Sequence, residues 1–398
     1  MLTSRRTFLG AAVAGLAAAQ VPESIRNLRP MTDGVAPITA DERRARVEKA
    51  RRLMHDQKLG AIYMERGSSM FYYTGTRDVS GVLIPAKGEL AWIVTEPEAS
   101  KVKGDVVTWK DPEGPYRAIS KALKDRGVTT GQVGLEEQVR FSIFEGLHKE
   151  APALEFSNAT SVTAACRMIK SKAEIALMQH AADVTIAAYK AGLATLREGM
   201  SPNELSGNIA EAYRALGYRG NAAVSFGVNT AFPHGSIQAQ KLKDGDMILI
   251  DDGCTVDGYQ SDITRAVVFG KASARQKQIW ALERKAQDAA LAAARPGATC
   301  ESVDAAARKV ITDFGFGPDY KVPGLPHRTG HGIGLDIHEW TNLVRGNKTR
   351  LEPGMCFSDE PMIIEGTFGC RLEDCIYITE DGVRTFSKQS PAIDQPFG

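Results

Sequence analysis

The chain has 398 residues, of which 43% are hydrophobic, and it carries a formal net charge of +1 at pH 7. At roughly 150 residues per domain, this length predicts two or three domains. The near-zero charge argues against sequence-independent binding of nucleic acid, which requires a basic surface, so we expect a globular protein with other partners.

The first segment, residues 1–19, is typical of an export signal. Ser4-Arg5-Arg6-Thr7-Phe8-Leu9 resembles the twin-arginine motif. The following alanine-rich run ends in small residues suited to cleavage, and it is about half as long as a membrane span. A general secretory signal with chance arginines is the alternative. We predict a twin-arginine signal peptide, export to the periplasm or the medium, and no stable membrane anchor.

A small domain follows the signal and a proline-rich tether. Residues 20–38 lack periodicity and are interpreted as the tether, while Thr39 and Glu42 form a capping box that begins a basic helix. Short apolar strands such as 61–64 and 81–84 then alternate with helical runs such as 116–126. The pattern predicts a small α/β domain over residues 39–165, with no cluster of catalytic side chains.

A second domain is predicted over residues 170–392. Capping boxes at Ser171 and Ser201 begin two helices, and a strand at 222–226 leads to Phe-Pro-His-Gly around His234. Two further helices, from about 273 to 294 and from about 300 to 314, separate two hairpins that carry acidic residues.

The first hairpin spans residues 248–269, ILIDDGCTVDGYQSDITRAVVF. Its two apolar arms meet at an Asp-Gly pair at 257–258, a favoured two-residue turn. Counting outward from that turn places Asp251 opposite Thr264. Asp262 then lies on the same face as Asp251, on the diagonal, at about 7–8 Å between backbones.

Asp252 has the opposite parity and is expected to point to the other face of the hairpin. Asp251 and Asp262 repel each other unless a proton or a cation lies between them. Two solvated surface acids are the alternative interpretation, but the flanking apolar runs favour a buried pair.

The second hairpin repeats this design over residues 355–378. If the loop is 366–369, Glu360 faces Cys375, and Glu373 lies on the same face as Glu360, on the diagonal. The two hairpins therefore look like pseudo-symmetric halves that each offer a pair of acids.

Between the hairpins, HRTGHGIGLDIHE places His327, His331 and His338 close together, although the chain has only seven histidines. Structural histidines are the alternative interpretation. Four acids and an imidazole would suit two divalent cations, Mn²⁺ or Co²⁺ first and Zn²⁺ or Fe²⁺ as further candidates. The six cysteines show no Cys-x-x-Cys spacing, so we expect buried free thiols and leave one disulfide open.

The acids and the histidine stand in SDITR, GHGIGLDIHE and RLED, and their order resembles the pita-bread metallopeptidases. Within that superfamily the chain is similar to the Xaa-Pro aminopeptidases and Xaa-Pro dipeptidases (prolidases). The resemblance implies an α+β fold with a creatinase-like N-terminal domain and a pita-bread catalytic domain. The ordered set is Asp251, Asp262, His331, Glu360 and Glu373.

The resemblance also implies a role for each ligand. Asp251 would hold one metal ion, His331 and Glu360 would hold the other, and Asp262 and Glu373 would bridge the two. A hydroxide shared by the ions would attack the peptide bond between an N-terminal residue and proline. A peptide with proline at its second position is the implied partner, and the enzyme is expected to be a homodimer.

Other residues are implied to act on the substrate. Glu360 would relay a proton to the leaving nitrogen, and His234 and His338 would stabilise the carbonyl and the oxyanion. His327 and Arg371 are implied to support substrate binding, with Arg371 also orienting the acids.

The chain departs from the family pattern Glu-Pro-Gly-x-Tyr beside the second hairpin. Glycine is replaced by Met362 and tyrosine by Ile364, and an acid, Asp359, stands where an aliphatic residue is usual. A metal-dependent hydrolase or lyase of a small molecule on the same fold is therefore the alternative function. A silent binding module is disfavoured because all five ligand positions are present.

Overall fold

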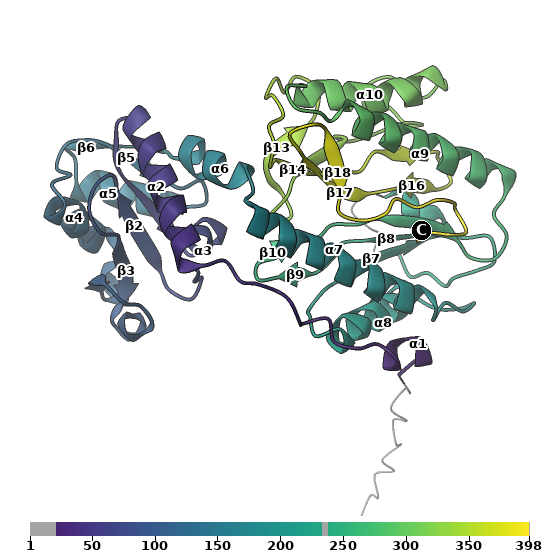
Figure 1. The fold of residues 1–398 in the computed structure, drawn as a ribbon, viewed down its shortest axis with the longest axis horizontal. Coiled ribbons are helices and arrows are strands. Elements are labelled where there is room, and N and C mark those ends of the chain that lie inside the picture. The colour runs from purple at the N-terminus through teal and green to yellow at the C-terminus, as the bar shows by residue number, and fades with distance from the viewer. Residues whose placement is uncertain (1–20, 233–237, 398) are drawn as a thin grey trace, which may run out of the picture.

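The computed structural model describes residues 21–232 and 238–397, which form two lobes (Figure 1). The smaller lobe ends with helix α6 (Thr160–Met168), and the larger begins with the long helix α7 (Lys172–Leu193). Each lobe combines helices with β-sheet, which confirms the two-domain α+β fold expected from the sequence.

The N-terminal domain is built on a mixed six-stranded sheet of order β4-β3-β2-β1-β5-β6. The central strands are apolar and buried, as expected for a sheet covered by helices. The strands predicted at 61–64 and 81–84 are present as β1 and β2, and the helix predicted at 116–126 is α4. The elements are α2 (Ala40–Asp56), β1 (Leu59–Glu65), α3 (Ser68–Thr74), β2 (Gly81–Pro85), β3 (Ala91–Thr95), η1 (Glu96–Lys101), β4 (Asp105–Trp109), η2 (Asp111–Glu113), α4 (Tyr116–Asp125), β5 (Gly131–Leu135), α5 (Phe141–Glu150) and β6 (Leu154–Asn158).

The described part of the predicted tether, residues 21–38, is packed rather than free. It contains a short helix, α1 (Glu23–Arg26), whose Ile25 is buried in the core. Ser24 donates a hydrogen bond to a carbonyl of α7, and Met31 donates one to the carbonyl of Leu216. The tether interpretation is corrected here: apolar side chains within an unpatterned segment dock it along the larger lobe (Figure 1).

The larger lobe contains two main β-sheets between two pairs of helices, α7 with α8 and α9 with α10 (Figure 1). The first sheet has the order β11-β8-β7, and the second has the order β13-β12-β14-β17-β18. The elements after α7 are α8 (Pro202–Ala215), β7 (Ala223–Phe226), η3 (Gly227–Ala231), β8 (Met247–Asp251), β9 (Thr255–Val256), β10 (Tyr259–Gln260), β11 (Arg265–Val268), α9 (Ala274–Ala293), α10 (Cys300–Asp313), β12 (Gly330–Gly332), β13 (Glu339–Leu343), β14 (Cys356–Asp359), β15 (Met362–Ile364), β16 (Gly369–Arg371), β17 (Asp374–Ile378) and β18 (Val383–Thr385).

The starts of these helices follow the capping residues found in the sequence. Ser171 and Ser201 each cap their helix in a complete capping box with a glutamate three residues later. Ser273 caps α9 in the same way with Gln276. Thr39 accepts a hydrogen bond from the backbone nitrogen of Glu42 and so begins α2, but the capping box predicted there is incomplete, because the Glu42 carboxylate binds Arg46 and Ser171 instead.

The first ligand hairpin has the predicted register. Asp257 and Gly258 form the turn between β9 and β10, and both have positive φ, 45° and 88°. The pairing of β8 with β11 carries this register outward, so that Asp251 lies opposite Thr264. The hydroxyl oxygen of Thr264 is 2.7 Å from Asp251 Oδ1.

The register predicted for the second ligand hairpin is wrong. Cys375 pairs with Ser358 rather than with Glu360, because the turn comprises two residues, 366–367, instead of four. Gly366 has a φ of 120°, a conformation open mainly to glycine, and this permits the tighter turn. Glu360 therefore falls directly opposite Glu373, and the two acids share one face as expected.

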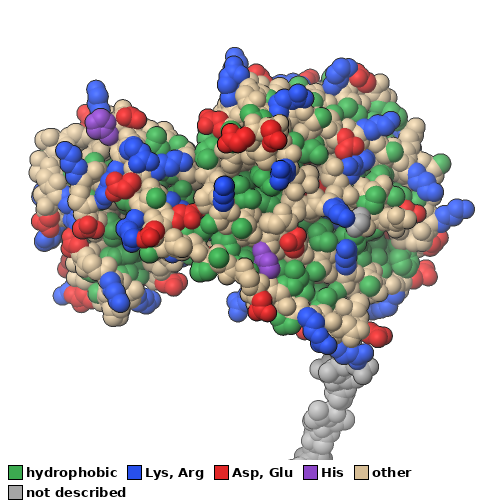
Figure 2. Space-filling view, in the orientation of Figure 1, with side chains coloured by type: hydrophobic (Ala, Val, Ile, Leu, Met, Phe, Trp, Pro, Cys, Tyr) green, Lys and Arg blue, Asp and Glu red, His purple; other side chains and the backbone are tan. Residues whose placement is uncertain are grey.

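All six cysteines are buried and none forms a disulfide, so the expected free thiols are present. Burial raises the pKa of Cys254 to about 11 and that of Cys356 to about 12, which keeps both thiols protonated. On the surface, basic and acidic side chains are interspersed over both lobes in the view of Figure 2.

Candidate metal centre

A cavity of about 720 Å³ lies in the larger lobe, where the two ligand hairpins and the histidine segment meet. All the predicted metal ligands line it, together with three other predicted site residues; His234 lies outside the described residues. These lining residues are Asp251, Asp262, His331, Glu360 and Glu373 as ligands, and His327, His338 and Arg371 as the others.

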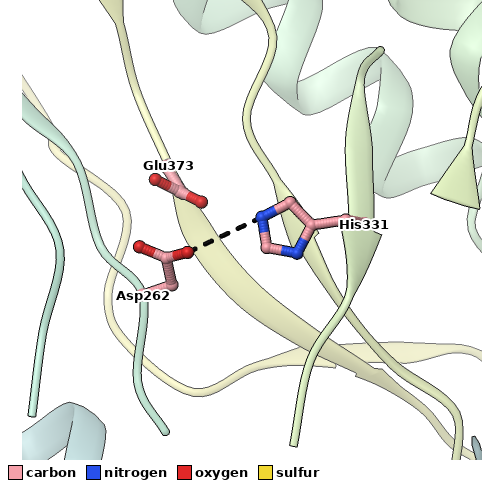
Figure 3. A group of neighbouring side chains, drawn as sticks. All are labelled: Asp262, His331 and Glu373. Atoms are coloured by element: carbon pink, nitrogen blue, oxygen red, sulfur yellow. Dashed lines mark ion pairs between the residues drawn. The ribbon is translucent and has the colours of Figure 1, made fainter. Parts of the chain in front are cut away.

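Asp262, His331 and Glu373 point toward one another from three separate segments of the chain (Figure 3). One ligand atom from each lies within 4.8 Å of those of the other two. His331 Nε2 is 3.6 Å from Asp262 Oδ2 and 3.1 Å from Glu360 Oε1. Because His331 Nδ1 lies 3.1 Å from the carbonyl of Gly332, it can donate there and leave Nε2 to bind a cation.

The carboxylates of this cluster are buried close together, so their negative charges repel one another. Burial raises the pKa of Asp262 and that of Glu373 well above their ordinary values, and repulsion from neighbouring acids raises them further. Among the described residues, Glu373 Oε1 has no hydrogen-bond partner although it is buried. A buried orphan oxygen beside three acids and an imidazole fits a divalent cation, which would stabilise the ionised acids.

Thr264 and Arg371 hold the acids in place. The Thr264 hydroxyl lies 2.7 Å from Asp251 Oδ1 and 2.6 Å from Glu373 Oε2, so it joins the two hairpins. Arg371 is buried; its Nε donates to the Thr264 hydroxyl, and its other nitrogens approach Asp251 and Glu360. Arg371 therefore contacts two of the acids that it is expected to orient. Thr264 was recognised only as a register partner, since its hydroxyl bridges elements far apart in sequence.

His338 and His327 occupy the wall of the cavity. The His338 ring packs edge-on against His331 with ring centroids 4.3 Å apart. His327 directs Nδ1 to the carbonyl of Arg328 at 2.6 Å, and its buried Nε2 has no partner within the described residues. Burial lowers the pKa of both imidazoles; the charge of Arg371 lowers that of His327 further, and the charges of His331 and Arg328 lower that of His338 further.

Two further residues of the wall were missed or misplaced by sequence reasoning. Asp252 lines the cavity instead of facing away, because β8 ends at Asp251 and the φ of Asp252 is 111°, which ends the alternation of the strand. Arg328 also lines the cavity, and its side chain makes no hydrogen bond or ion pair with the described residues. The sequence around Arg328 does not indicate that its guanidinium lacks an acidic partner.

The departures from the family pattern lie away from the described wall. Met362 is fully buried in the core between α9, α10 and the second hairpin, and neither it nor Ile364 belongs to the described lining of the cavity. Asp359 is buried, and its two carboxylate oxygens lack partners among the described residues. Burial raises the pKa of Asp359 well above its ordinary value, and repulsion from Asp374 raises it further.

Comparisons with known families match both lobes. Residues 176–380 match the family described as "Metallopeptidase family M24", and residues 46–169 match the "Creatinase/Prolidase N-terminal domain". The two matches agree with the division of the chain into a small N-terminal domain and a larger domain that carries the cavity.

Individual relatives point the same way. The chain is 36% identical over 303 residues to an Xaa-Pro dipeptidase of Lactobacillus helveticus, which covers 74% of this chain and 80% of the relative. It is 30% identical over 352 residues to an Xaa-Pro dipeptidase of Pyrococcus furiosus; the match covers 86% of this chain and 97% of the relative. Its fold matches the crystal structure of a dipeptidase from Pyrococcus horikoshii with a TM-score of 0.80 at 29% identity, covering 88% of this chain and 99% of the other.

Proposed function

Because this chain belongs to metallopeptidase family M24, we propose that it is an Xaa-Pro dipeptidase with a dinuclear metal centre. One observation carries the proposal: all five acid and imidazole ligands expected of such a centre line a single cavity. The family and its dependence on divalent metal fit the donor set of this cavity, which contains buried oxygens and one imidazole nitrogen and no thiolate among its described residues.

In the proposed arrangement, Asp251 would hold one ion, His331 and Glu360 would hold the other, and Asp262 and Glu373 would contribute to both. Mn²⁺ or Co²⁺ is the first choice for such a site, with Zn²⁺ or Fe²⁺ as alternatives. When bound, the ions would supply Lewis-acid activation of a water nucleophile and of the scissile carbonyl.

The protein groups around the ligands have separate tasks in this proposal. Glu360 accepts the proton of the nucleophile and returns it to the leaving nitrogen. His338 and His234 donate to the oxygen that becomes negative, and a neutral imidazole can donate in this way. His327 supports the bound substrate from the same wall, and Arg371 keeps Asp251 and Glu360 oriented.

Arg328 favours a dipeptide over a longer peptide. It is a permanent cation on the wall of an acid-rich cavity, and no described acid pairs with it. In a dipeptide ending in proline, a free carboxylate follows the scissile bond directly, and a guanidinium can bind that carboxylate in a bidentate manner. A longer peptide places an uncharged amide at the same point and gains no such interaction.

A panel of peptides tests the proposed function. We expect Ala-Pro to be hydrolysed with a kcat/KM well above that of Ala-Ala, and Ala-Pro amide to be a poor substrate, by roughly 10-fold or more, since it lacks the carboxylate. Arg328→Met should reduce the difference between Ala-Pro and its amide. The measurement is kcat/KM with Mn²⁺ added.

Equal kcat/KM for Ala-Pro and Ala-Ala would contradict the proposal, as would no turnover of either with metal bound. The second result would favour the alternative, a metal-dependent hydrolase or lyase of a small molecule. That alternative drew on Met362 and Ile364, and their absence from the described cavity wall weakens its support.

We further propose export through the twin-arginine pathway, based on Ser4–Leu9 and the alanine run that follows. Replacing both Arg5 and Arg6 by lysine is expected to retain the protein in the cytoplasm, because that pathway requires the arginine pair. The check is the amount of enzyme in the periplasmic fraction, with Arg26→Lys, which lies outside the motif, as the matched control. Unchanged periplasmic yield of the double variant would indicate a general secretory signal.

Within residues 21–232 and 238–397, no helix has the length and apolar character needed to cross a membrane. The homodimer implied by the family resemblance stays a proposal, and light scattering of the purified enzyme would test it.

A further inference from the structure

The segment 333–338 leads from His331 to His338, and Glu339 closes it into a compact turn. Oε1 of Glu339 accepts hydrogen bonds from the backbone nitrogens of Leu335, at 2.8 Å, and Asp336, at 3.3 Å. One carboxylate therefore fixes the path of the backbone immediately before the histidine that faces the metal ligands.

Two cations from the connection between the domains hold this carboxylate. Lys170 Nζ donates to Glu339 Oε2 at 2.8 Å, and Arg167 Nη2 donates to Glu339 Oε1. The three side chains are almost inaccessible to solvent: Lys170 is 2% exposed, Glu339 4% and Arg167 7%. Although burial raises the pKa of Glu339, the charges and hydrogen bonds of Lys170 and Arg167 lower it to about 2, so Glu339 is ionised at neutral pH.

The N-terminal domain also binds the same turn directly. Asp336 accepts hydrogen bonds from Arg167, at 2.6 Å, and from Ser68 of α3, at 2.6 Å. Glycine at position 334 leaves room for the Lys170 side chain, since a Cβ atom there would lie 2.7 Å from Lys170 Cε. We call Arg167, Lys170, Asp336 and Glu339 the junction cluster.

Packing alone does not fix His338. Its ring lines the catalytic cavity, and it also lines a second cavity of about 340 Å³ that is bounded by Arg167, Asp336 and residues of the N-terminal domain. His338 is also exposed to solvent, so it lacks the dense contacts that hold a core residue in one rotamer. Its position must therefore come from the backbone that carries it and from its edge-on contact with His331.

We propose that Glu339, held by Lys170 and Arg167, is a positioning residue for His338, so that the junction between the domains sets the geometry of the catalytic wall. The inference rests on the proposed function, in which His338 donates to the reacting oxygen. Buried ion clusters contribute little net stability compared with apolar packing, whereas paired charges fix geometry. In the junction cluster each charge has an opposite partner, although Arg167 Nε lacks a hydrogen-bond partner among the described residues. Positioning therefore accounts for these buried charges better than stability does.

Glu339→Gln tests the proposal because glutamine keeps an oxygen for the two backbone donors and removes the charge that Lys170 and Arg167 bind. We expect kcat to fall roughly 10- to 100-fold with KM little changed, as for a misplaced catalytic group. Metal content should stay near the wild-type value, whereas the melting temperature should fall, because the buried Lys170 and Arg167 lose the charge that compensates them. Lys170→Met should give a loss in the same direction, and it provides a second variant if Glu339→Gln does not fold.

A double-mutant cycle separates positioning from general damage. In a His338→Ala background, Glu339→Gln should cause no further loss of kcat, because the residue through which it acts is absent. Arg46→Met is the matched control: Arg46 is another buried arginine at the domain junction, paired with Glu42 and Glu174, and its loss should leave kcat unchanged. An equal loss of kcat in both backgrounds, or from the control, would overturn the proposal.

A second readout does not depend on peptidase activity. In zinc-loaded protein labelled with ¹⁵N-histidine, Glu339→Gln should shift or broaden the ring signals of His338, while the exposed His55 and His148 keep theirs. Unchanged His338 signals would refute the positioning role even if kcat falls. If the wild type cleaves no Xaa-Pro bond, the proposed function fails while this spectrum still tests the link between Glu339 and His338.

Discussion

Replacing Asp262 or Glu373 by alanine is expected to abolish hydrolysis of Ala-Pro. Each residue is proposed to bridge both ions, and each is buried beside other acids whose charges would lose their compensation. Elemental analysis of the purified variants should show loss of bound metal, and activity should fall below detection. His331→Ala should lose one ion and most of the activity.

Asp252→Asn is the matched control, because Asp252 lines the same cavity without belonging to the predicted ligand set. This variant should keep its metal. A bridging variant that retains its full metal content and activity would refute the assignment of Asp262 and Glu373, whereas metal loss in Asp252→Asn alone would move the centre toward Asp252.

The second large effect is expected at His338. Changing His338 to alanine should lower kcat by roughly 10²–10³, the usual loss when one donor to an oxyanion is removed, with a smaller change in KM. His234→Ala is expected to behave similarly, although His234 lies outside the described residues. The ring of His338 packs against His331 and borders the cavity, which places it near the reacting carbonyl in the proposed complex.

Steady-state kinetics on Ala-Pro with saturating Mn²⁺ is the measurement, with metal content determined on the same samples. His55→Ala, an exposed histidine of the N-terminal domain, serves as the control and should match the wild type. A His338 variant with normal kcat, or one whose loss is explained by missing metal, would show that His338 does not act on the reacting oxygen.

The proposed ligand set can be read from the sequence because its residues stand in two hairpins and one histidine segment, and the structure places all five in one cavity. The register of the first hairpin was predictable since an Asp-Gly turn admits two residues with positive φ. The second was misjudged because a run of four turn-forming residues, 366–369, does not reveal which pair makes the turn. The alternation of side chains along a strand does not predict the direction of Asp252, because β8 ends at Asp251, one residue before it.

Other features depend on tertiary contacts that no local pattern encodes. The packing of residues 21–38 along α7 and α8 follows from a few apolar side chains such as Ile25. The guanidinium of Arg328 has no hydrogen-bond or ion-pair partner among the described residues. The absence of a partner depends on the folded surroundings and cannot be read from the sequence. In the junction cluster, Arg167 and Lys170 bind Glu339, which lies about 170 positions later in the sequence.

We propose that cleavage of Xaa-Pro bonds requires two ions held by the five ligands of this cavity. The direct test is to strip the wild-type enzyme with a chelator, return Mn²⁺ stepwise, and measure bound metal and Ala-Pro hydrolysis together. We predict no activity in the stripped enzyme and maximal activity only when about two ions are bound per chain. Full activity after exhaustive chelation, or maximal activity with no more than one ion bound, would contradict the proposed dinuclear centre.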